Sequence, residues 1–474
     1  MDFLANIDYF SNDFTIHEFT IHEFTIHEFT TSDFTTTKFT TKGQKMITVS
    51  ELKAAIFHRC EIYNQNFPIA KREWIKLPTL QAVNHIVAND VASSLDLPRQ
   101  NLSAMDGFAL CKGADLAENS VFDVIGESCA GSPFLGECVA NQAVRIFTGA
   151  VVPTDCDTVV MQEDTDFAPM NHKIDKTKPY TITLTKPANL GANIRKQGEE
   201  IVQNETVLEA GKRLNPSDIS LLANLGISSV TVVKPLTVGI LATGDELVNI
   251  GEPLKHLAQI YNSNTPTLKT LLSYLPIKIH DYDIIPDDLE KTTQAVKLAI
   301  HECDVIISSA GVSVGDYDFL TTVVDNLGKI NHYKVLMKPG KPFVFGEFNT
   351  DSKQVLYFGL PGNPLSTVVG CLQFVRPALW QLTGCKDDDL PKTLQLSAVC
   401  QKQIIKKGRR QEFQRAYFSQ NAHAEFVVTP FDPQDSHRVK QLTKANCLLI
   451  LPAECTGVNV GDKVMIEVFD WNFG

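Results

Sequence analysis

The stretch Val305-Ile-Ile-Ser-Ser-Ala-Gly-Val-Ser-Val-Gly-Asp-Tyr-Asp318 joins a short apolar run to a loop of small residues and carboxylates. Two other apolar runs, residues 238–241 and 355–358, also lead into glycine-containing loops. Between these runs, residues 288–303 carry apolar side chains at helical spacing. Buried strands that alternate with amphipathic helices predict a central parallel sheet covered by helices, over residues 235–384.

The segments on either side of this region are predicted to be rich in β-strands. Between Phe122 and Thr185, short apolar segments alternate with turn residues. Apolar residues alternate again near the C-terminus, which predicts a small β-barrel over residues 392–474. Because 474 residues exceed what one hydrophobic core supports, the chain is predicted to be a multi-domain α/β protein.

The N-terminal segment differs from the rest of the chain. Residues 13–42 repeat with a period of five, including three copies of Phe-Thr-Ile-His. Neither a helix nor a strand has this period. Low complexity of this kind is typical of a disordered segment, although the three histidines leave metal binding open. We therefore predict that residues 1–45 form a disordered tail and that Met46 opens the globular sequence.

The composition excludes several classes of protein. A net charge of −12 argues against a general nucleic-acid binder, which needs a broad basic surface. The eleven cysteines include no Cys-x-x-Cys pair, so a zinc ribbon is not indicated. No signal segment is found, and prolines at 361 and 364 interrupt the longest uncharged stretch. We expect a cytoplasmic protein without nucleic-acid or membrane partners.

Carboxylates follow the ends of two predicted strands. Asp245 and Glu246 come shortly after residues 238–241, and Asp316 and Asp318 close the loop quoted above. In open α/β sheets, ligands bind at the carboxyl ends of strands, and small residues let backbone N–H groups approach an anion. Two carboxylates beside a phosphate require a divalent cation, and such hard oxygen ligands suit Mg²⁺. A lone Gly-Asp-Glu is also common at an ordinary helix start, so a structural role for that pair stays open.

A basic stretch precedes another apolar strand. Lys334, Lys338 and Lys341 lie close together in the sequence, and a Pro-Gly turn brings the last two toward each other. Lysines at strand edges often protect against aggregation, but this turn favours a pocket for an oxyanion. A further loop, residues 359–366, leads from an apolar strand into a helix whose first N–H groups can meet an anion.

Together these motifs resemble the MoeA-type molybdopterin molybdotransferases, a family that includes the C-terminal domain of gephyrin. The likeness runs from Met46 to Gly474. It rests on eight motifs in order: Ser103-Ala-Met-Asp-Gly-Phe-Ala109, Arg145-Ile-Phe-Thr-Gly149, Val159-Val-Met-Gln-Glu163, Asn193-Ile-Arg-Lys-Gln-Gly-Glu-Glu200, Ala242-Thr-Gly-Asp-Glu246, the loop 311–318, Met337-Lys-Pro-Gly-Lys-Pro342 and Leu360-Pro-Gly-Asn-Pro364. Ala310 stands where this family commonly has a glycine, and Glu200 where it commonly has an aspartate.

The resemblance implies an elongated homodimer of four-domain subunits. Residues 46–76 and 191–234 would form the N-terminal dimerisation domain, and residues 77–190 a β-rich domain inserted in it. The central domain would bind molybdopterin. Each active site would lie between this α/β domain and the N-terminal part of the partner subunit.

The resemblance also implies roles for residues that match the motifs. Basic and polar side chains would hold molybdate: Lys338, Lys341, Ser313, Arg415 and Ser436. Lys334, from the basic stretch described above, is predicted to contact the substrate as well. Three carboxylates would act in catalysis and bind Mg²⁺, namely Asp287, Asp318 and Glu246, while Asp245 would contact the substrate. Four residues would reach in from the partner subunit: the catalytic Asp106, and Thr148, Arg195 and Glu200 as substrate contacts.

The implied reaction inserts molybdate into adenylated molybdopterin and releases AMP, which gives the molybdenum cofactor. We expect transient contact with the adenylyltransferase that supplies this substrate. Two alternatives are a gephyrin-like scaffold and the adenylation step itself. The chain has no adenylyltransferase domain and no long linker, which argues against the scaffold. Its flanking N- and C-terminal domains argue against an adenylyltransferase.

Overall fold

The computed structural model describes residues 45–167, 180–310, 312, 319–351 and 353–472. The predicted tail lies outside this part apart from Lys45, and Ser313 and Asp318 lie outside it as well. In the part that is described, no helix is long and apolar enough to cross a membrane.

The central α/β domain contains a seven-stranded sheet in the order β1-β18-β20-β21-β17-β13-β16. Strands β16, β13, β17 and β21 are parallel neighbours, as predicted. Strand β20 runs antiparallel to both β18 and β21, so one reversed strand interrupts the predicted parallel sheet. The connection to β21 is a tight turn, in which Thr350 N–H donates to Lys353 O (2.9 Å), and such a turn permits only a hairpin. The strands are β1 Lys45–Ile47, β13 Leu236–Thr243, β16 Ile277–Ile285, β17 Val305–Ser309, β18 Lys329–Val335, β20 Pro342–Asn349 and β21 Gln354–Leu360.

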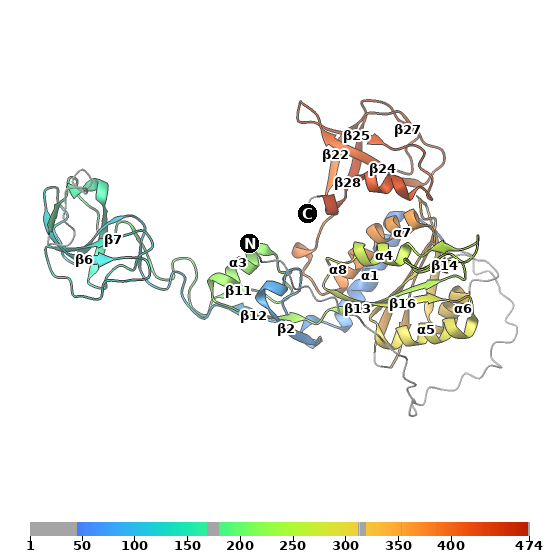
Figure 1. The fold of residues 1–474 in the computed structure, drawn as a ribbon, viewed down its shortest axis with the longest axis horizontal. Helices are drawn as coiled ribbons and strands as arrows, with labels where there is room; N and C mark the ends of the chain where they lie inside the picture. The colour runs from blue at the N-terminus through green and yellow to red at the C-terminus, as the bar shows by residue number, and fades with distance from the viewer. Residues whose placement is uncertain (1–44, 168–179, 311, 313–318, 352, 473–474) are drawn as a thin grey trace. The chain divides into compact units, whose positions relative to one another are not determined.

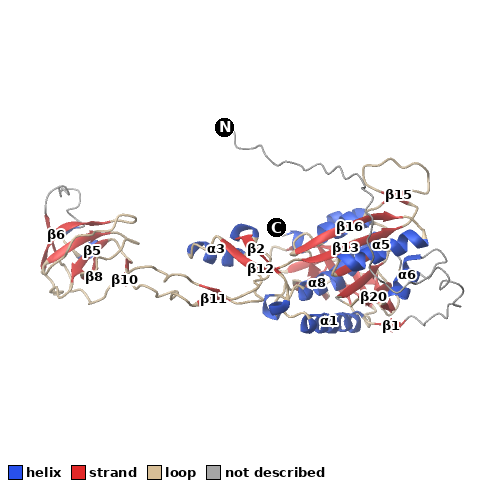
Figure 2. Cartoon of the chain, turned by 90° about the horizontal axis from the view of Figure 1, so that it is seen from below, coloured by secondary structure: helices blue, strands red, loops and turns tan. Residues whose placement is uncertain are grey.

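Helices cover both faces of this sheet (Figures 1 and 2). Side chains of α1, α4, α7 and α8 share one core with the sheet, and those of α5 and α6 share the other. Successive residues of a strand point to opposite faces, so Val305 and Ile307 of β17 enter the first core and Ile306 the second. The helices are α1 Val49–Asn66, α4 Asn264–Leu271, α5 Leu289–Glu302, α6 Phe319–Leu327, α7 Pro364–Gly370 and α8 Arg376–Leu382.

Helix α1 packs with the α/β domain, although the sequence analysis groups residues 46–76 with the N-terminal domain. Thr48 caps the helix through a reciprocal capping box with Glu51. The apolar stripe of α1, which includes Leu52 and Ile56, lies in the core of the α/β domain, and the preceding β1 pairs with β18. Helical spacing identifies the apolar face of a helix but not the domain that buries it.

Three short antiparallel pairings join residues 74–103 to residues 194–233, so residues 77–103 pair with the N-terminal domain and not with the inserted domain to which the predicted boundaries assign them. They are β2 Trp74–Pro78 with β12 Ser229–Val233, β3 Val91–Ala92 with β11 Thr206–Leu208, and β4 Leu102–Ser103 with β10 Ile194–Arg195. Helix α3, Pro216–Asn224, begins at a capping box formed by Asn215 and Asp218. The core of this part contains Val87, Leu222 and Val232.

The inserted segment forms a five-stranded sheet in the order β8-β5-β7-β6-β9, so this part is rich in β-strands as predicted. Phe108 and Val160 lie in a core on one side of the sheet, and Ala109 and Val159 lie in a core on the other. The strands are β5 Gly107–Cys111, β6 Val121–Ser128, β7 Gln142–Ile146, β8 Cys156–Met161 and β9 Tyr180–Thr183.

The C-terminal segment forms the predicted small barrel. Its strands follow the order β24-β25-β22-β28-β26, and a pairing of β24 with β26 closes the ring. The short strand β19, Met337–Lys338, pairs with β24 in parallel, so the lysine-rich stretch contacts this barrel. The barrel strands are β22 Gln395–Cys400, β24 Gln411–Gln420, β25 Phe426–Pro430, β26 Cys447–Leu451 and β28 Lys463–Val468.

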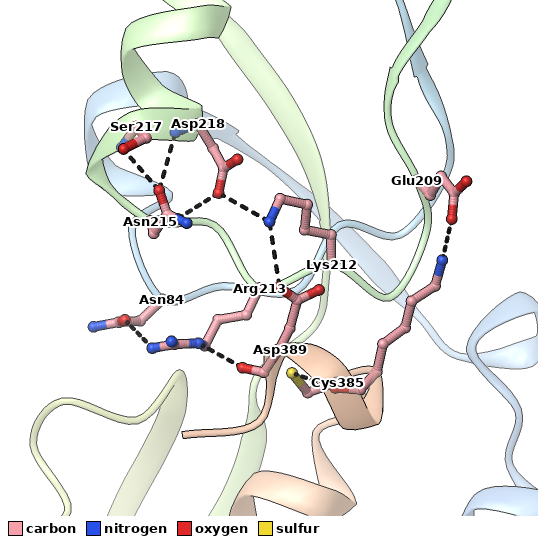
Figure 3. Close-up of polar contacts among 10 residues, drawn as sticks. Asn84, Glu209, Lys212, Arg213, Asn215, Ser217, Asp218, Cys385 and Asp389 are labelled. Atoms are coloured by element: carbon pink, nitrogen blue, oxygen red, sulfur yellow. Dashed lines mark hydrogen bonds and ion pairs between the residues drawn. The ribbon is translucent and has the colours of Figure 1, made fainter. Parts of the chain in front are cut away.

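Polar contacts join the loop before α3 to the segment that follows α8 (Figure 3). The ammonium of Lys212 lies 3.5 Å from Asp218 Oδ2 and 3.3 Å from Asp389 Oδ1. Arg213 Nε donates to the backbone carbonyl of Asp389 (3.0 Å). These bonds connect two segments that lie far apart in the sequence.

Candidate functional site

The loops predicted to carry the chemistry emerge at one edge of the central sheet. Neighbouring parallel strands end level with one another, at Thr243, Ile285, Ser309 and Leu360. Because β20 runs in the reverse direction, its first residue, Pro342, lies at this edge too, opposite Lys334 of β18. The edge therefore gathers the loops that begin at Gly244, Pro286, Ala310 and Pro361 with the lysine-rich loop before Pro342.

Asp245 and Asp287 hold each other's loops in place. The Asp287 N–H donates to Asp245 Oδ1 (3.1 Å), and the Asp245 N–H donates to Asp287 Oδ2 (3.4 Å). Both residues are exposed. Each carboxylate thus fixes the backbone of the loop that follows the neighbouring strand. It also remains exposed to solvent at the sheet edge, where a ligand would bind.

Glu246 lies beside this pair, in a loop that needs a glycine. Gly244 has a φ of +144°, and a Cβ added to it would lie 2.5 Å from a carboxylate oxygen of Glu246. The backbone carbonyl of Glu246 accepts a bond from Ile260 N–H (2.8 Å). The exposed Glu246 side chain therefore lies back over the glycine.

The predicted metal ligands are only partly placed. Asp287 and Glu246 lie at the sheet edge, whereas Asp318 lies outside the described residues, as does the predicted molybdate contact Ser313. Among the residues that the structure describes, no three His, Cys, Asp or Glu side chains gather as a metal site would require. The two-carboxylate arrangement of Asp245 and Asp287 can supply hard oxygen ligands to a cation that a substrate phosphate also contacts.

The end of strand β17 carries an unusual backbone conformation. Ala310 has a φ of +129°, a region that favours glycine. Its N–H donates to Leu360 O (3.1 Å), and its carbonyl accepts from the Ser308 hydroxyl (3.2 Å). The Ser308 hydroxyl also bonds the hydroxyl of Tyr357 (2.6 Å). These bonds hold Ala310 in a conformation that a glycine would adopt without strain.

The three predicted lysines share the edge but differ in their surroundings. Lys334 and Lys341 are exposed. Lys338 Nζ lies 3.7 Å from Oε1 of Glu412, whose side chain is only 5% exposed. Gln414 Nε2 also donates to Glu412 (2.9 Å). Glu412 was not predicted, and it holds the Lys338 ammonium against the barrel.

Arg415, a predicted molybdate contact, is held inside the barrel. The residue is fully buried in the barrel. Its guanidinium donates to Gln434 Oε1 (3.1 Å), and to the backbone carbonyls of Arg438 (3.0 Å) and Pro433 (3.5 Å). Burial lowers the pKa of this guanidinium. Arg415 therefore supports the loop that contains the half-exposed Ser436, and its contact with molybdate stays a prediction.

Asp106 and Thr148 form a direct pair in the inserted domain. The Thr148 N–H and hydroxyl both donate to Asp106 Oδ1, at 2.7 and 2.8 Å. These two bonds, the backbone one first, hold the pKa of the Asp106 carboxyl below its ordinary value. Both residues are exposed. The two predicted residues are thus placed together, with the carboxyl in its charged form.

Arg195 has a partner that the sequence analysis missed. Its Nε donates to Glu199 Oε1 (2.7 Å), whereas the predicted Glu200 lies 4.0 Å from its Nη2. The sequence does contain a signal for this ion pair, because Arg195 and Glu199 carry opposite charges and lie four residues apart. Strand β10, which carries Arg195, pairs with β4 just before Asp106. The four residues assigned to the partner subunit therefore lie on neighbouring segments.

The predicted residues fall into two groups, which share no polar contact among the residues that the structure describes. Over the described ranges, no hydrogen bond or ion pair connects Asp106, Thr148 or Arg195 to the loops at the edge of the α/β sheet. One group lies in the N-terminal segments and the other at the sheet edge.

Known protein families match most of the chain from residue 47 onward. Family models match three consecutive parts of the chain: "MoeA N-terminal region (domain I and II)" at residues 47–226, "Probable molybdopterin binding domain" at 239–381 and "MoeA C-terminal region (domain IV)" at 397–469. The structure of the molybdopterin biosynthesis MoeA protein from Pyrococcus horikoshii OT3 has the same fold, with a TM-score of 0.69 at 23% identity over 90% of this chain and 100% of that one.

Two relatives are similar in sequence over most of their length. The molybdopterin molybdenumtransferase of Haemophilus influenzae is 37% identical over 394 residues, which are 83% of this chain and 93% of the relative. That of Staphylococcus epidermidis is 33% identical over 405 residues, 83% of this chain and 90% of the relative. The resemblance inferred from the sequence motifs is thereby confirmed, and the chain belongs to the MoeA-type molybdopterin molybdenumtransferase family.

Proposed function

We propose that this chain inserts molybdenum from molybdate into adenylated molybdopterin and releases AMP. Family membership supports the overall activity, and one geometric observation supports the site. The exposed carboxylates of Asp245 and Asp287 lie at the same sheet edge as the exposed lysines Lys334 and Lys341. Such an edge can receive both a phosphate and an oxyanion.

The difficulty of the reaction is electrostatic. Molybdate, the dithiolene sulfurs and the phosphate all carry negative charge and repel one another at contact distance. Fixed positive charges at the contact point offset this repulsion without having to reorganise. Lys334 and Lys341 have no ion-pair partner among the described residues, so both ammonium groups can bind an oxyanion. Lys338, held near Glu412, supplies a third and more oriented ammonium.

Mg²⁺ is the cation that the carboxylates would suit. It commonly takes one or two carboxylates together with substrate phosphates, and Asp245 and Asp287 present hard oxygens in this way. Bound there, it would offset charge on the phosphate that leaves. Glu246 and Asp318 are further candidate ligands. The reciprocal bonds between Asp245 and Asp287 keep both carboxylates at the edge, whatever else completes the site.

A homodimer would complete the site. Asp106, Thr148 and Arg195 lie in the N-terminal segments and have no bond to the sheet-edge loops of their own chain within the described residues. In a symmetric dimer, the same surfaces of a second copy can supply such residues in trans. The adenylated substrate must come from a separate adenylyltransferase, so we also expect a transient contact with that enzyme.

The test is release of AMP by the purified protein. We expect AMP to form from adenylated molybdopterin only when molybdate and Mg²⁺ are both present. Sulfate in place of molybdate is the control, since it is an oxyanion of equal charge that cannot bind the dithiolene as a metal. If AMP appears at the same rate without molybdate, or does not appear at all, the proposed function is refuted.

A further inference from the structure

Arg145 is a buried cation surrounded by aromatic rings. It lies in strand β7 and is 6% exposed. Its guanidinium carbon lies 4.9 Å from the ring centroid of Phe108, 5.0 Å from that of Phe147 and 4.7 Å from that of Phe167. Aromatic faces attract a cation most strongly where water is excluded. The side chain is therefore held as a flat group among three rings.

The hydrogen bonds of Arg145 lead to the two peptide groups that directly follow the Cα of Asp106. Its Nη1 donates to the carbonyl of Gly107, the residue after Asp106 (2.9 Å). Its Nη2 donates to Gln162 Oε1 (2.7 Å), and the Gln162 N–H donates to the carbonyl of Asp106 (3.1 Å). One guanidinium thus fixes the peptide groups that set the position of the Asp106 side chain.

Within the described residues, no carboxylate lies within ion-pair distance of the Arg145 guanidinium. The carboxylates of Asp106, Glu127 and Glu163 favour its charge only from a greater distance. A buried charge without an ion-pair partner is costly, so a residue needed only for packing would be better apolar. The positive charge also adds, after the two Thr148 bonds, to the causes that lower the pKa of Asp106.

Gly107 leaves the backbone little room to adjust by itself. A Cβ added to Gly107 would lie 1.8 Å from the carbonyl oxygen of Val160 in the neighbouring strand β8. The start of β5, directly after Asp106, is therefore pressed against β8 on one side and bonded to Arg145 on the other. The turn before β5 presents the Asp106 carboxylate to Thr148, two residues after the end of β7.

From these contacts we infer that Arg145 is a positioning residue for Asp106 and Thr148: its planar fork holds the turn between β4 and β5 so that the carboxylate faces the donors of Thr148. This inference rests on the proposed function only in that Asp106 acts in the reaction. A lysine cannot replace the arginine, since an ammonium lacks the planar fork that reaches Gly107 and Gln162 together.

The first test needs no substrate. The exchange rate of the Thr148 amide hydrogen reports directly on its bond to Asp106. We measure it by mass spectrometry on the protein as purified, in whichever oligomeric state it has. In Arg145→Lys we expect this amide to exchange about 10- to 100-fold faster, as loss of a charge-assisted bond predicts. Unchanged exchange at Thr148 would overturn the inference. Gln162→Leu, which removes one acceptor and leaves the arginine, gives a milder variant with a smaller increase in the same direction.

A matched control separates positioning from general loss of stability. Arg72 also lies near a ring, 5.8 Å from the centroid of Tyr63, and donates to Phe67 O, Leu382 O and Asn64 Oδ1. Arg72→Lys should lower the thermal midpoint without changing exchange at Thr148. Equal acceleration at Thr148 in both variants would mean that the effect is global, and would also overturn the inference.

The second test couples Arg145 to Asp106 in the reaction. If Arg145 acts through Asp106, then Arg145→Lys should lower kcat about 10- to 100-fold in the wild-type background and leave the residual activity of Asp106→Asn unchanged. Additive losses in the double variant would contradict the inference. Absence of molybdate-dependent AMP release by the wild-type protein would instead refute the proposed function, and the exchange result would still decide the role of Arg145.

Discussion

Asp245 and Asp287 each accept a hydrogen bond from the other's backbone, at 3.1 and 3.4 Å, across the ends of the neighbouring strands β13 and β16. Each carboxylate can still bind a ligand, because both side chains remain exposed. The pair thus behaves as one unit that aligns two loops and presents two negative groups to a ligand. Removal of either member should disturb both loops.

This relationship predicts non-additive mutants. Asp245→Ala and Asp287→Ala should each lower kcat on the order of 100-fold, since a misplaced loop costs about that much, and the double variant should lose little more. Excess molybdate should restore neither. The control is Glu290→Ala, which removes an exposed carboxylate from the first turn of α5. Steady-state AMP release gives kcat for all four proteins. If the two single losses of kcat multiply in the double variant, the two carboxylates act independently.

Lys341 should act on molybdate alone. Loss of one charge-assisted contact of ~1.5–3 kcal/mol raises the molybdate requirement about 10- to 150-fold. Lys341→Ala should therefore raise the KM for molybdate and leave binding of adenylated molybdopterin unchanged. Lys278→Ala is the control, since Lys278 is an exposed lysine near the start of β16, at the other end of the sheet. A variant whose substrate binding weakens while its molybdate KM stays normal would assign Lys341 to the phosphate instead.

Much of the central domain could be predicted from the sequence, because apolar runs followed by glycine-containing loops are local signals. The edge that gathers Asp245 and Asp287 follows from strand direction alone. Lys341 lies at the same edge only because β20 runs in the reverse direction. The reversal of β20 was missed, since a hairpin and a crossover have similar apolar runs. The packing of α1 was missed because its partner surface lies far away in the sequence.

The side-chain environments could not be predicted. The motif around Arg415 identified it as a site residue but did not indicate that it is completely buried. No feature of the neighbouring sequence indicated that Glu412 would pair with Lys338. Both depend on which face of β24 turns into the barrel. The roles of all the predicted site residues stay predictions, and Asp318 and Ser313 also lie outside the described residues.

Ala310→Gly should stabilise the protein. Alanine at a φ of +129° carries backbone strain, which glycine relieves. Glycine also raises the conformational entropy of the unfolded chain, but this cost is smaller than the strain that is relieved. We expect a net gain of about 1 kcal/mol, seen as a higher thermal midpoint. Ala299→Gly provides the opposite control, because Ala299 is buried within helix α5, where glycine costs about 1 kcal/mol. A lower midpoint for Ala310→Gly would show that the methyl group of Ala310 contributes packing that outweighs the strain.

Thr148→Val should change the dependence of stability on pH. The pKa of Asp106 is lowered in the folded state, mainly by the Thr148 bonds, so its contribution is complete above the unfolded value of about 4 and is lost as the pH falls through the folded value. The deficit of the variant in thermal midpoint should therefore be present at neutral pH and shrink below about pH 4. Thr165→Val is the control, since that hydroxyl donates to a backbone carbonyl, Gln162 O (2.8 Å), which does not titrate. Deficits that respond equally to pH in both variants would remove Asp106 as the cause.

Mixed dimers should reveal whether the site is shared between subunits. Asp106 belongs to the group in the N-terminal segments and Lys341 to the sheet edge, and no bond links the two groups within one chain over the described residues. If a site takes Asp106 from one subunit and Lys341 from the other, a dimer of Asp106→Ala with Lys341→Ala has one doubly altered site and one intact site. After random exchange, half of the dimers are mixed, so about a quarter of the wild-type AMP release at limiting molybdate should return.

Mixing Asp106→Ala with the Asp106→Ala/Lys341→Ala double variant controls for exchange itself and should restore nothing. If the first mixture also stays inactive although native mass spectrometry shows mixed dimers, each site is built within one subunit and the shared-site proposal fails.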